Sequence, residues 1–274
     1  MTQPRIDDLE FVIFDTETTG LDHRAGDRIV ELAAMRVRAG QRLGVFESLV
    51  NPRRPISAGA FAVNRITPEM LEHAPAIEEV LPRFASFARG SVLCSYNLAF
   101  DLGFLSAELA HMQACLPEHR AMVDILSLAR VLMPQLPRHA LWFVAGEMGI
   151  RAVQKHRAFA DVEMAWEVFS RLKKMLLEKG ISGAGDFLRL FRFKTQGLDD
   201  ETAATMAALQ EAIDVKADIA IHYFSRSRAE VSWRRIIPRR IKQEAGYAYL
   251  VGFCTARNAE RTFRIDHILE IKTK

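Results

Sequence analysis

Four carboxylates and one histidine have the types and spacing for hydrolytic chemistry with divalent metal ions. They are Asp15, Glu17, Asp101, His156 and Asp161. Hard oxygen ligands in this number, without cysteine, suit Mg²⁺ or Mn²⁺ rather than zinc. Two such ions about 4 Å apart can activate a water, clamp a phosphate and stabilise a leaving oxygen. Because histidine titrates near neutral pH, His156 is suited to take a proton from that water.

Asp15 and Glu17 directly follow residues 11–14, an apolar run that is typical of a buried strand. Side chains alternate along a strand, so positions two residues apart lie on the same side of the backbone. Two neighbouring carboxylates repel each other and need a cation, a shared proton or solvent. The alternative interpretation is an acidic strand end that runs into a turn and has no chemical role.

The other two carboxylates are expected at helix starts. Asp101 lies in the first turn of a helix predicted over residues 99–111, where an acid also simply complements the helix dipole. Asp161 begins a long predicted helix and shares its face with Ala165 and Val168. An acid on an apolar face needs a partner to offset its burial. Each carboxylate has a structural alternative, but together they fit one mechanism.

The elements that must position these residues form a mixed α/β pattern. Residues 29–37 and 43–50 are β-like and separated by a short turn, so the chain is expected to open with a three-stranded meander. Residues 52–68 are predicted to be a loop because prolines interrupt them. A short strand is predicted over residues 91–96. Helices are predicted over residues 77–88, 99–111, 125–133, 140–148 and 158–177.

A glycine-rich stretch at residues 180–185 marks the expected domain boundary. Residues 186–194 show no clear periodicity, while the acidic residues 199–201 could begin a helix that runs to about residue 213. The pattern is then β-like over residues 219–224, 231–237, 247–253 and 262–265. This region is therefore predicted to be a small all-β module with one leading helix.

The composition is that of an ordinary globular protein, with 49% apolar and 26% charged residues in a chain of 274. No stretch of 18 residues lacks charges, and the first residues include no apolar signal segment. We therefore expect a soluble, cytoplasmic protein with no membrane partner. Three cysteines without metal-like spacing favour neither a disulfide framework nor a zinc site.

The net charge of +3 is unevenly distributed along the chain. Residues 216–274 carry 13 Lys and Arg against 6 Asp and Glu, a balance of +7. The preceding 215 residues have a balance of −4. An acidic first part and a basic last part indicate two modules with different partners.

Three ordered motifs resemble those of the DEDDh exonucleases, the family of the proofreading subunit of bacterial replicative DNA polymerase. They are Phe-Asp-Thr-Glu-Thr-Thr-Gly-Leu at 14–21, Tyr-Asn-Leu-Ala-Phe-Asp at 96–101 and His-Arg-Ala-Phe-Ala-Asp at 156–161. The likeness covers residues 10–178. It implies a ribonuclease H-like mixed sheet flanked by helices. The implied activity is metal-dependent removal of nucleoside 5′-monophosphates from a free 3′ end of DNA or RNA.

The resemblance also implies a role for each matching residue. The carboxylates Asp15, Glu17, Asp101 and Asp161 would bind two Mg²⁺ or Mn²⁺ ions, and His156 would be the general base. Further positions match those that hold the terminal nucleotide in the family, with turn formation and core packing as the alternative interpretation. These positions are Thr18, Gly20, Leu21, Asn97 and Phe100.

One departure from the family pattern lies beside the expected substrate groove. Relatives often have His-Gly-Ile before Thr-Pro-Glu, and this chain has Asn64, Arg65 and Ile66. Arg65 thus replaces a small flexible residue. The departure concerns the grip on the terminal nucleotide and not the chemistry.

Residues 203–274 resemble the WYL domain, a small β-rich module often attached to bacterial transcription regulators and nucleases. The likeness rests on residues 221–223, 235–238, 247–251 and 261–268, although Ala248 stands where tryptophan is usual. It implies an SH3/Sm-like barrel that binds a nucleotide or single-stranded nucleic acid. A solvated basic face is the alternative. The candidate ligand-binding residues are Tyr223, Tyr249, Arg257, Arg261 and Arg264.

The sequence therefore predicts a bacterial 3′-to-5′ exonuclease with a catalytic domain at 1–178, a linker at 179–202 and a WYL-like domain at 203–274. Two alternatives stay open. In the first, the exonuclease-like fold is inactive and only binds nucleic acid, which the five intact chemical residues oppose. In the second, the chain is a polymerase-associated proofreading subunit, which the WYL-like module in place of a polymerase-binding tail opposes.

Overall fold

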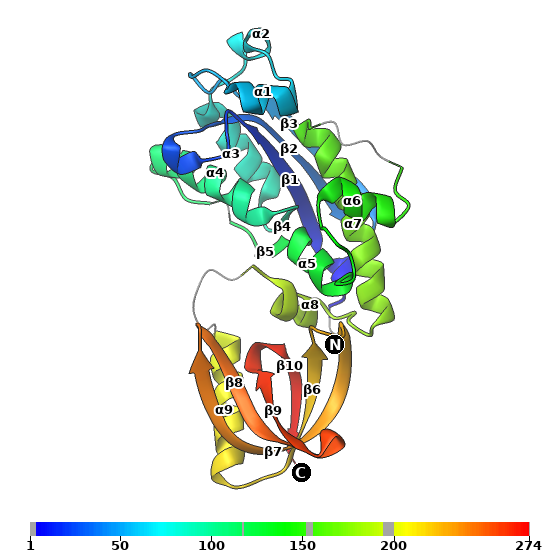
Figure 1. The fold of residues 1–274 in the computed structure, drawn as a ribbon. Coiled ribbons are helices and arrows are strands. Elements are labelled where there is room, and N and C mark those ends of the chain that lie inside the picture. Colours follow the sequence, from blue (N-terminus) through cyan, green and yellow to red (C-terminus); the bar gives the residue numbers. More distant parts are fainter. Residues whose placement is uncertain (1–3, 117, 152–155, 194–199, 274) are drawn as a thin grey trace. The chain divides into compact units, whose positions relative to one another are not determined.

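A computed structural model describes residues 4–116, 118–151, 156–193 and 200–273. The chain forms two compact units, which divide between Met175 and Leu176 (Figure 1). The stretch predicted as a linker, residues 179–202, contains the helix α8 (Ala184–Phe191) and lies wholly on the second unit's side of this division. The predicted domain limits stay a prediction.

The first unit is built on a five-stranded mixed sheet with the order β3-β2-β1-β4-β5. Its strands are β1 (Glu10–Thr18), β2 (Ile29–Arg38), β3 (Gln41–Leu49), β4 (Val92–Ser95) and β5 (Ala121–Asp124). β1, β2 and β3 are antiparallel neighbours, whereas β4 runs parallel to β1 and β5. Ala39 and Gly40 have φ angles of 49° and 78°, as a two-residue hairpin turn requires. The predicted meander is therefore confirmed.

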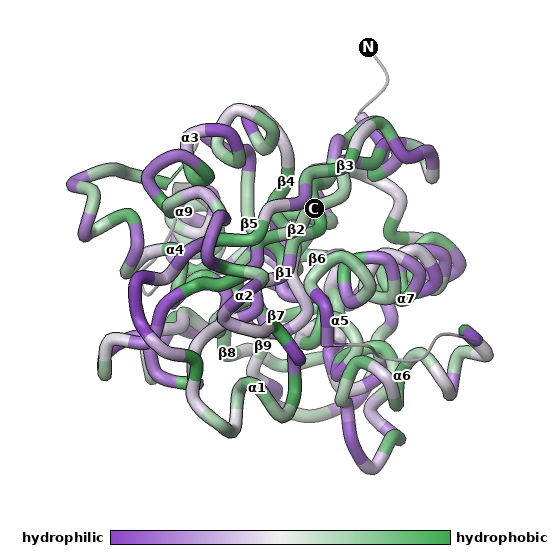
Figure 2. Tube along the Cα trace, turned by 90° about the horizontal axis from the view of Figure 1, so that it is seen from above, coloured by the Kyte–Doolittle hydropathy of each residue, from purple (hydrophilic) through white to green (hydrophobic). Residues whose placement is uncertain are grey.

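Helices cover both faces of this sheet, because the side chains of β1 alternate between them. Phe14 contacts Phe84 of α3 (Ile77–Ala88), with ring centroids 5.7 Å apart. Phe11 contacts Phe169 of α7 (Ala158–Glu178) at 5.0 Å from the other face. In Figure 2 the tube of α7 alternates between hydrophobic and hydrophilic colours, as expected of a helix with one buried face. The remaining helices of this unit are α1 (Ala58–Asn64), α2 (Pro68–Glu72), α4 (Leu98–His111), α5 (Ile125–Leu132) and α6 (Leu141–Glu147).

The structure corrects the sequence reading in two stretches. Residues 52–68 include the helix α1, in which the Ser57 hydroxyl accepts a hydrogen bond from the Ala60 N–H at 3.1 Å. A helix of two turns is too short to show a clear apolar period. The prolines were therefore the stronger signal, and they indicated a loop. Residues 186–194 fall largely in α8, which buries Phe187 and Leu190. Their spacing of three is helical, but the intervening arginine obscured it.

The second unit is a five-stranded antiparallel sheet with the order β10-β6-β7-β8-β9. Leu209 and Ala212 of the helix α9 (Asp200–Asp214) belong to the same apolar core as Ile221 and Leu250. This arrangement confirms the predicted β-rich module with one leading helix. The strands are β6 (Ile219–Ser225), β7 (Glu230–Glu244), β8 (Tyr247–Cys254), β9 (Ala259–Arg264) and β10 (Ile268–Thr273). β7 is longer than predicted, and the sequence reading did not separate β10 as a strand.

Of the helices that the structure describes, none has both the length and the apolar composition that a membrane span requires.

Candidate active site

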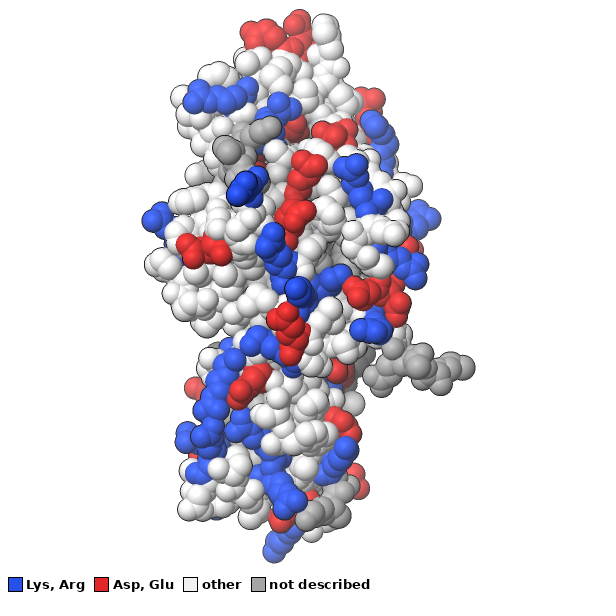
Figure 3. Space-filling view, turned by 90° about the vertical axis from the view of Figure 1, so that its right-hand side faces the viewer, with Lys and Arg blue, Asp and Glu red and all other residues white. Residues whose placement is uncertain are grey.

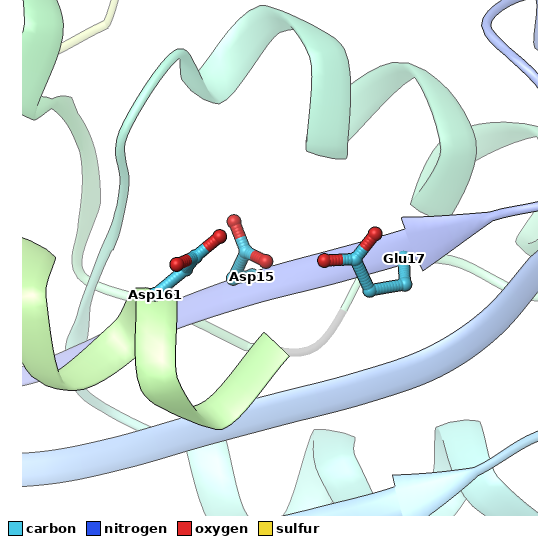
Figure 4. Close-up of side chains that lie close together, drawn as sticks. All are labelled: Asp15, Glu17 and Asp161. Atoms are coloured by element: carbon cyan, nitrogen blue, oxygen red, sulfur yellow. The ribbon is translucent and has the colours of Figure 1, made fainter. Parts of the chain in front are cut away.

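Asp15, Glu17 and Asp161 meet on the face of the sheet that α7 covers. Figure 4 shows the side chains of Asp15 and Glu17 on β1 and that of Asp161 on the first turns of α7. One carboxylate oxygen from each residue lies within 4.8 Å of the other two. The alternation of strand side chains accounts for the shared face of Asp15 and Glu17. The three carboxylates are therefore close enough to share a cation.

Burial and mutual repulsion raise the pKa values of Asp15 and Glu17. Burial is the largest cause of the raised pKa of Asp15, and the neighbouring carboxylates add to it. The pKa of Glu17 rises to about 8, first because of burial and then because of the charges of Asp161 and Glu31. A divalent cation would offset this repulsion, and a set of three carboxylates suits Mg²⁺ or Mn²⁺. The donor set therefore fits the predicted ions.

Asp101 lies beside this cluster but is not one of its three members. The Thr16 N–H and hydroxyl donate to Asp101 Oδ1 at 3.0 and 2.7 Å, and the Ser95 hydroxyl donates to Oδ2. The pairing of β1 with β4 ends at Ile13 and Cys94. The Thr16 N–H lies beyond that end, and Asp101 accepts its hydrogen bond in place of a strand partner. Burial raises the pKa of Asp101 to about 6, against the effect of these donors.

The turn between β4 and α4 has an unusual backbone at Asn97, with φ 75° and ψ 53°. Asparagine tolerates this left-handed conformation better than most residues. The N–H groups of Asn97 and Leu98 both donate to Asp124 Oδ1 at 3.2 Å. Asp124, which the sequence reading did not select, therefore holds the second motif in place.

The third motif is attached to the sheet through Glu31 of β2. The guanidinium of Arg157 donates to Glu31 from Nη2 to Oε1 at 2.6 Å and from Nε to Oε2 at 3.1 Å. The Ala158 N–H donates to Oε2 at 2.9 Å. His156 is half-buried with φ 49°, and the residues just before it, 152–155, lie outside the described ranges. Glu31 therefore positions the start of α7, between His156 and Asp161.

Glu31 is a second residue that the sequence reading missed. It lies opposite Glu17 in the register of β1 and β2, so its charge adds to the repulsion around Glu17. The ion pair with Arg157 offsets part of that charge. A glutamate inside the apolar run at 29–37 was the available signal, because a buried charge requires a partner.

A cavity of about 590 Å³ opens beside Glu17. Four of the five residues predicted to hold the terminal nucleotide line it, namely Thr18, Gly20, Leu21 and Phe100. A Cβ atom at Gly20 would lie 2.1 Å from Asp27 Oδ2, so close approach of that carboxylate requires glycine here. α1 forms part of the wall through Val63 and Asn64, and Arg65 ends α1 with φ 58°.

A second cavity, of about 420 Å³, opens beside Asp15 and Asp161. Asn97 lines this cavity rather than the first one. Its other walls come from the second motif, from α5 and from the start of α6. These residues are Tyr96, Leu126, Arg130, His139, Ala140, Leu141 and Trp142. The carboxylate cluster thus contributes to two cavities, one through Glu17 and one through Asp15 and Asp161.

The second unit contains a cavity of about 340 Å³. The predicted residues Tyr223, Arg257 and Arg261 line it, and so do two arginines that were not predicted, Arg228 and Arg234. In Figure 3 the lower part, which is the second unit, shows Lys and Arg spread over the visible face.

The other two predicted residues of this unit are not among the lining residues of that cavity. Arg264 forms an ion pair with Asp266 at 2.6 Å, and its guanidinium lies 3.9 Å from the ring centre of Tyr247. Lys242 lies 5.4 Å from the ring centre of Tyr249.

Two sequence families match the chain. Residues 12–169 match the RNase_T family, described as exonuclease, and residues 204–273 match the WYL domain family. The chain is 38% identical over 192 residues to a DNA polymerase III subunit epsilon-like protein of Rhodobacter capsulatus, which covers 69% of this chain and 27% of that protein. It is 33% identical over 181 residues to a PolC-type DNA polymerase III of Staphylococcus epidermidis, covering 66% of this chain and 12% of the polymerase. The chain thus spans a small part of these relatives.

Solved structures show the same fold. The nuclease domain of 3′hExo, a DEDDh family member bound to rAMP, matches with a TM-score of 0.55 and 15% identity over 68% of this chain and 97% of that one. E. coli exonuclease I in a zinc-bound complex with single-stranded DNA matches with a TM-score of 0.55 and 19% identity over 90% of this chain and 55% of that one. These likenesses confirm the predicted ribonuclease H-like sheet.

Proposed function

Because the chain belongs to the exonuclease family and carries a WYL domain, we propose that it removes nucleoside 5′-monophosphates from the 3′ ends of DNA or RNA. The observation that carries this proposal is the approach of Asp15, Glu17 and Asp161 to within 4.8 Å. Such a gathering of like charges is unfavourable without a cation. A cavity that Glu17 also lines offers room for a terminal nucleotide.

In this proposal the four carboxylates hold two Mg²⁺ or Mn²⁺ ions, with Asp101 completing the set. Bound ions would supply positive charge against the negative charge that develops on the scissile phosphate. His156 accepts a proton from the attacking water. The water oxygen bonds to phosphorus as the bond between phosphorus and the 3′ oxygen of the preceding nucleotide breaks, and that oxygen takes a proton from a solvent water. Thr18, Gly20, Leu21 and Phe100 hold the departing nucleotide, and Asn97 contacts the strand behind it.

For the second unit we propose an SH3/Sm-like barrel that binds a nucleotide or single-stranded nucleic acid. The short turn at Ile265–His267 connects β9 to β10, the two outer strands of the sheet order, which supports closure. The arginine-lined cavity and the charge balance of +7 support an anionic ligand. We retain residues 1–178 and 203–274 as the limits of the two domains.

The direct test is cleavage of 5′-labelled single-stranded DNA, single-stranded RNA and mismatched duplex with Mg²⁺ or Mn²⁺. We expect shortening by one nucleotide at a time. Asp15→Asn should abolish it, since losing even an outer partner of a metal ligand costs about 10–100-fold. Glu147→Gln is the matched control, because Glu147 is an exposed carboxylate on α6. Absence of cleavage on every substrate with both metals would refute the proposal.

Proofreading is the second candidate function, because the relatives are a polymerase and an epsilon-like protein. It predicts that a mismatched 3′ terminus is removed faster than a matched one. Comparing cleavage rates on the two termini in otherwise identical duplexes distinguishes this role from general degradation.

A further inference from the structure

We propose that Asp27 is a positioning residue for the terminal nucleotide, because its carboxylate fixes residues 19–22 as a wall of the first cavity. This inference rests on the proposed exonuclease function and adds a residue outside the three motifs to the nucleotide site. Asp27 acts through Gly20 and Leu21, which line the cavity with it, and not on the reacting atoms.

The carboxylate of Asp27 uses both of its oxygens to hold this segment. The Thr19 hydroxyl donates to Oδ1 at 3.0 Å, and the Asp22 N–H donates to Oδ2 at 3.1 Å. The Asp27 N–H donates in turn to the Asp22 carbonyl at 3.2 Å. Hydrogen bonds to an ionised carboxylate are roughly twice as strong as those between neutral groups. One side chain therefore fastens both ends of residues 19–22.

The packing at Gly20 supports this role independently. A Cβ atom at Gly20 would collide with the Asp27 carboxylate, and the three atoms nearest to that position all belong to Asp27. Gly20 is not one of the glycines with a positive φ, so its backbone conformation does not itself require glycine. The missing side chain at residue 20 therefore makes room for the carboxylate.

Leu21 depends on this arrangement because its own side chain is 84% exposed and makes few contacts that could hold it. Asp27 fixes the residues on either side of it, Gly20 by close packing and Asp22 by a hydrogen bond. A side chain on a fixed backbone can meet a ligand without first being ordered. Asp27 thus prepares Leu21 for contact with the nucleotide.

Two further contacts join this segment to the opposite wall of the first cavity, which α1 forms. Arg54 Nη2 lies 3.5 Å from Asp27 Oδ1, and the same guanidinium donates to the Gly26 carbonyl. The N–H of Ser57, the residue before α1, donates to the Thr19 carbonyl at 2.9 Å. The charge of Arg54 also offsets part of the negative charge that Asp27 brings to the cavity.

The direction of the expected effect separates positioning from electrostatics. Removing a negative charge close to a nucleotide phosphate would by itself strengthen binding. Removing a positioning residue should weaken binding, because the wall must then be ordered when the nucleotide enters. Asp27 is not one of the three carboxylates that approach within 4.8 Å, so its loss should leave metal binding unchanged.

The test is calorimetric titration of the full chain with thymidine 5′-monophosphate in Mn²⁺, beside titration with Mn²⁺ alone. Asp27→Ala should weaken nucleotide binding about tenfold, the effect of ordering one backbone residue, and leave Mn²⁺ affinity unchanged. Asp27→Asn should retain part of the nucleotide affinity, because its amide keeps one acceptor oxygen. Asp22→Asn is the matched control: it removes the same charge from the same loop and keeps an acceptor for the Arg24 N–H.

Gly20→Ala supplies a second arm of the test. Alone, it should weaken nucleotide binding as Asp27→Ala does, because the added methyl group displaces the carboxylate. Combined with Asp27→Ala, it should add little, since the methyl group then has room. Fully additive losses would mean that the two residues act independently, and they would overturn the inference.

Hydrogen exchange of residues 19–22 without nucleotide measures the holding role directly. Exchange should be faster in Asp27→Ala and unchanged in Asp22→Asn. Thermal unfolding shows whether each variant is folded, and the Asn variant preserves the test if the Ala variant is not. Unchanged nucleotide affinity in Asp27→Ala, or an equal loss of Mn²⁺ affinity, would overturn the inference. Failure of the exonuclease proposal is distinct, since it shows as a lack of cleavage by the unaltered chain.

Discussion

The two units gather charges of opposite sign in different surroundings. In the first, three carboxylates lie within 4.8 Å and burial raises the pKa of Glu17 to about 8. In the second, four arginines line one cavity on a small antiparallel sheet. Like charges brought together lower stability, which a ligand of the opposite charge would offset. In the second unit Glu230 already offsets part of the charge through ion pairs with Arg228 and Arg234. The first unit suits a cation, and the second suits an anion.

Burial determines how strongly each arrangement depends on its ligand. Asp161 is buried and Asp15 and Glu17 are half-buried, so solvent and salt screen their repulsion only in part. Surface arginines are screened by both. Substitutions in the first unit should therefore have large effects on cleavage and metal binding. Substitutions in the second unit should mainly change how strand binding depends on salt.

The largest effect outside the carboxylate cluster is expected for Glu31→Ala. It removes the ion-pair partner of Arg157 and the acceptor of the Ala158 N–H, so the start of α7 loosens. We expect kcat/KM to fall about 10–100-fold, as for other residues that orient metal ligands. The affinity for Mn²⁺ should fall as well. Steady-state cleavage measures kcat/KM, and calorimetric titration measures the Mn²⁺ affinity.

The matched variant is Glu31→Gln, which keeps an acceptor for the Ala158 N–H but loses the charge. It should retain more activity and more Mn²⁺ affinity than Glu31→Ala. Unchanged Mn²⁺ affinity in both variants would contradict the positioning role of Glu31.

An intermediate effect is expected when Arg257 and Arg261 are both replaced by alanine. Each phosphate contact to a single strand contributes about 0.7 to the slope of log affinity against log salt. The double variant should therefore bind a 20-nucleotide strand with a slope shallower by about 1.4. Arg239→Ala is the control, because Arg239 pairs with Glu260 and does not line the cavity. An unchanged slope in the double variant would exclude the cavity from strand binding.

A smaller effect is expected from pH in the metal-free protein. Glu17 keeps its proton up to about pH 8 when folded, against an ordinary value of 4.5. Between these values the folded state binds more protons, so the free energy of unfolding falls as pH rises. Thermal unfolding in a chelator should show a midpoint that drops as the pH is raised from 5 to 9.

Two comparisons accompany this pH series. Glu17→Gln should weaken the pH dependence without removing it, because the pKa values of Asp15 and Asp101 are raised as well. Mg²⁺ or Mn²⁺ should raise the midpoint most at high pH, where protons compete least. A midpoint that rises with pH in the metal-free protein would be inconsistent with a raised pKa at Glu17.

The smallest effect is expected for Arg65→Gly. Arg65 has φ 58°, a left-handed conformation that costs a residue with a side chain about 1–2 kcal/mol. Glycine relieves this strain but loses more conformational freedom on folding. The free energy of unfolding should therefore rise by about 0.5–1 kcal/mol. Urea unfolding measures it, with Ala39→Gly, at φ 49° in the hairpin, as a control of similar geometry. A loss of stability would mean that the Arg65 side chain makes a compensating contact.

Local patterns were sufficient to predict most elements of the first unit. Apolar runs and turn residues identified β1, the hairpin of β2 and β3, and the helices that carry Asp101 and Asp161. Where the pattern was short or interrupted by prolines, as in α1, it indicated a loop instead. The second unit was harder because its strands vary in length, and β10 follows β9 after only three residues.

The sequence by itself determined which residues could do the chemistry, since carboxylate type, motif order and strand periodicity are written along the chain. Only the tertiary structure decided which of them meet. It joined Glu31 to Arg157, placed Trp142 at the same cavity as Asp15, and left Tyr249 and Arg264 outside the lining of the arginine cavity. The physical reason is that periodicity specifies which face a side chain occupies. The neighbour across that face depends on how distant segments pack.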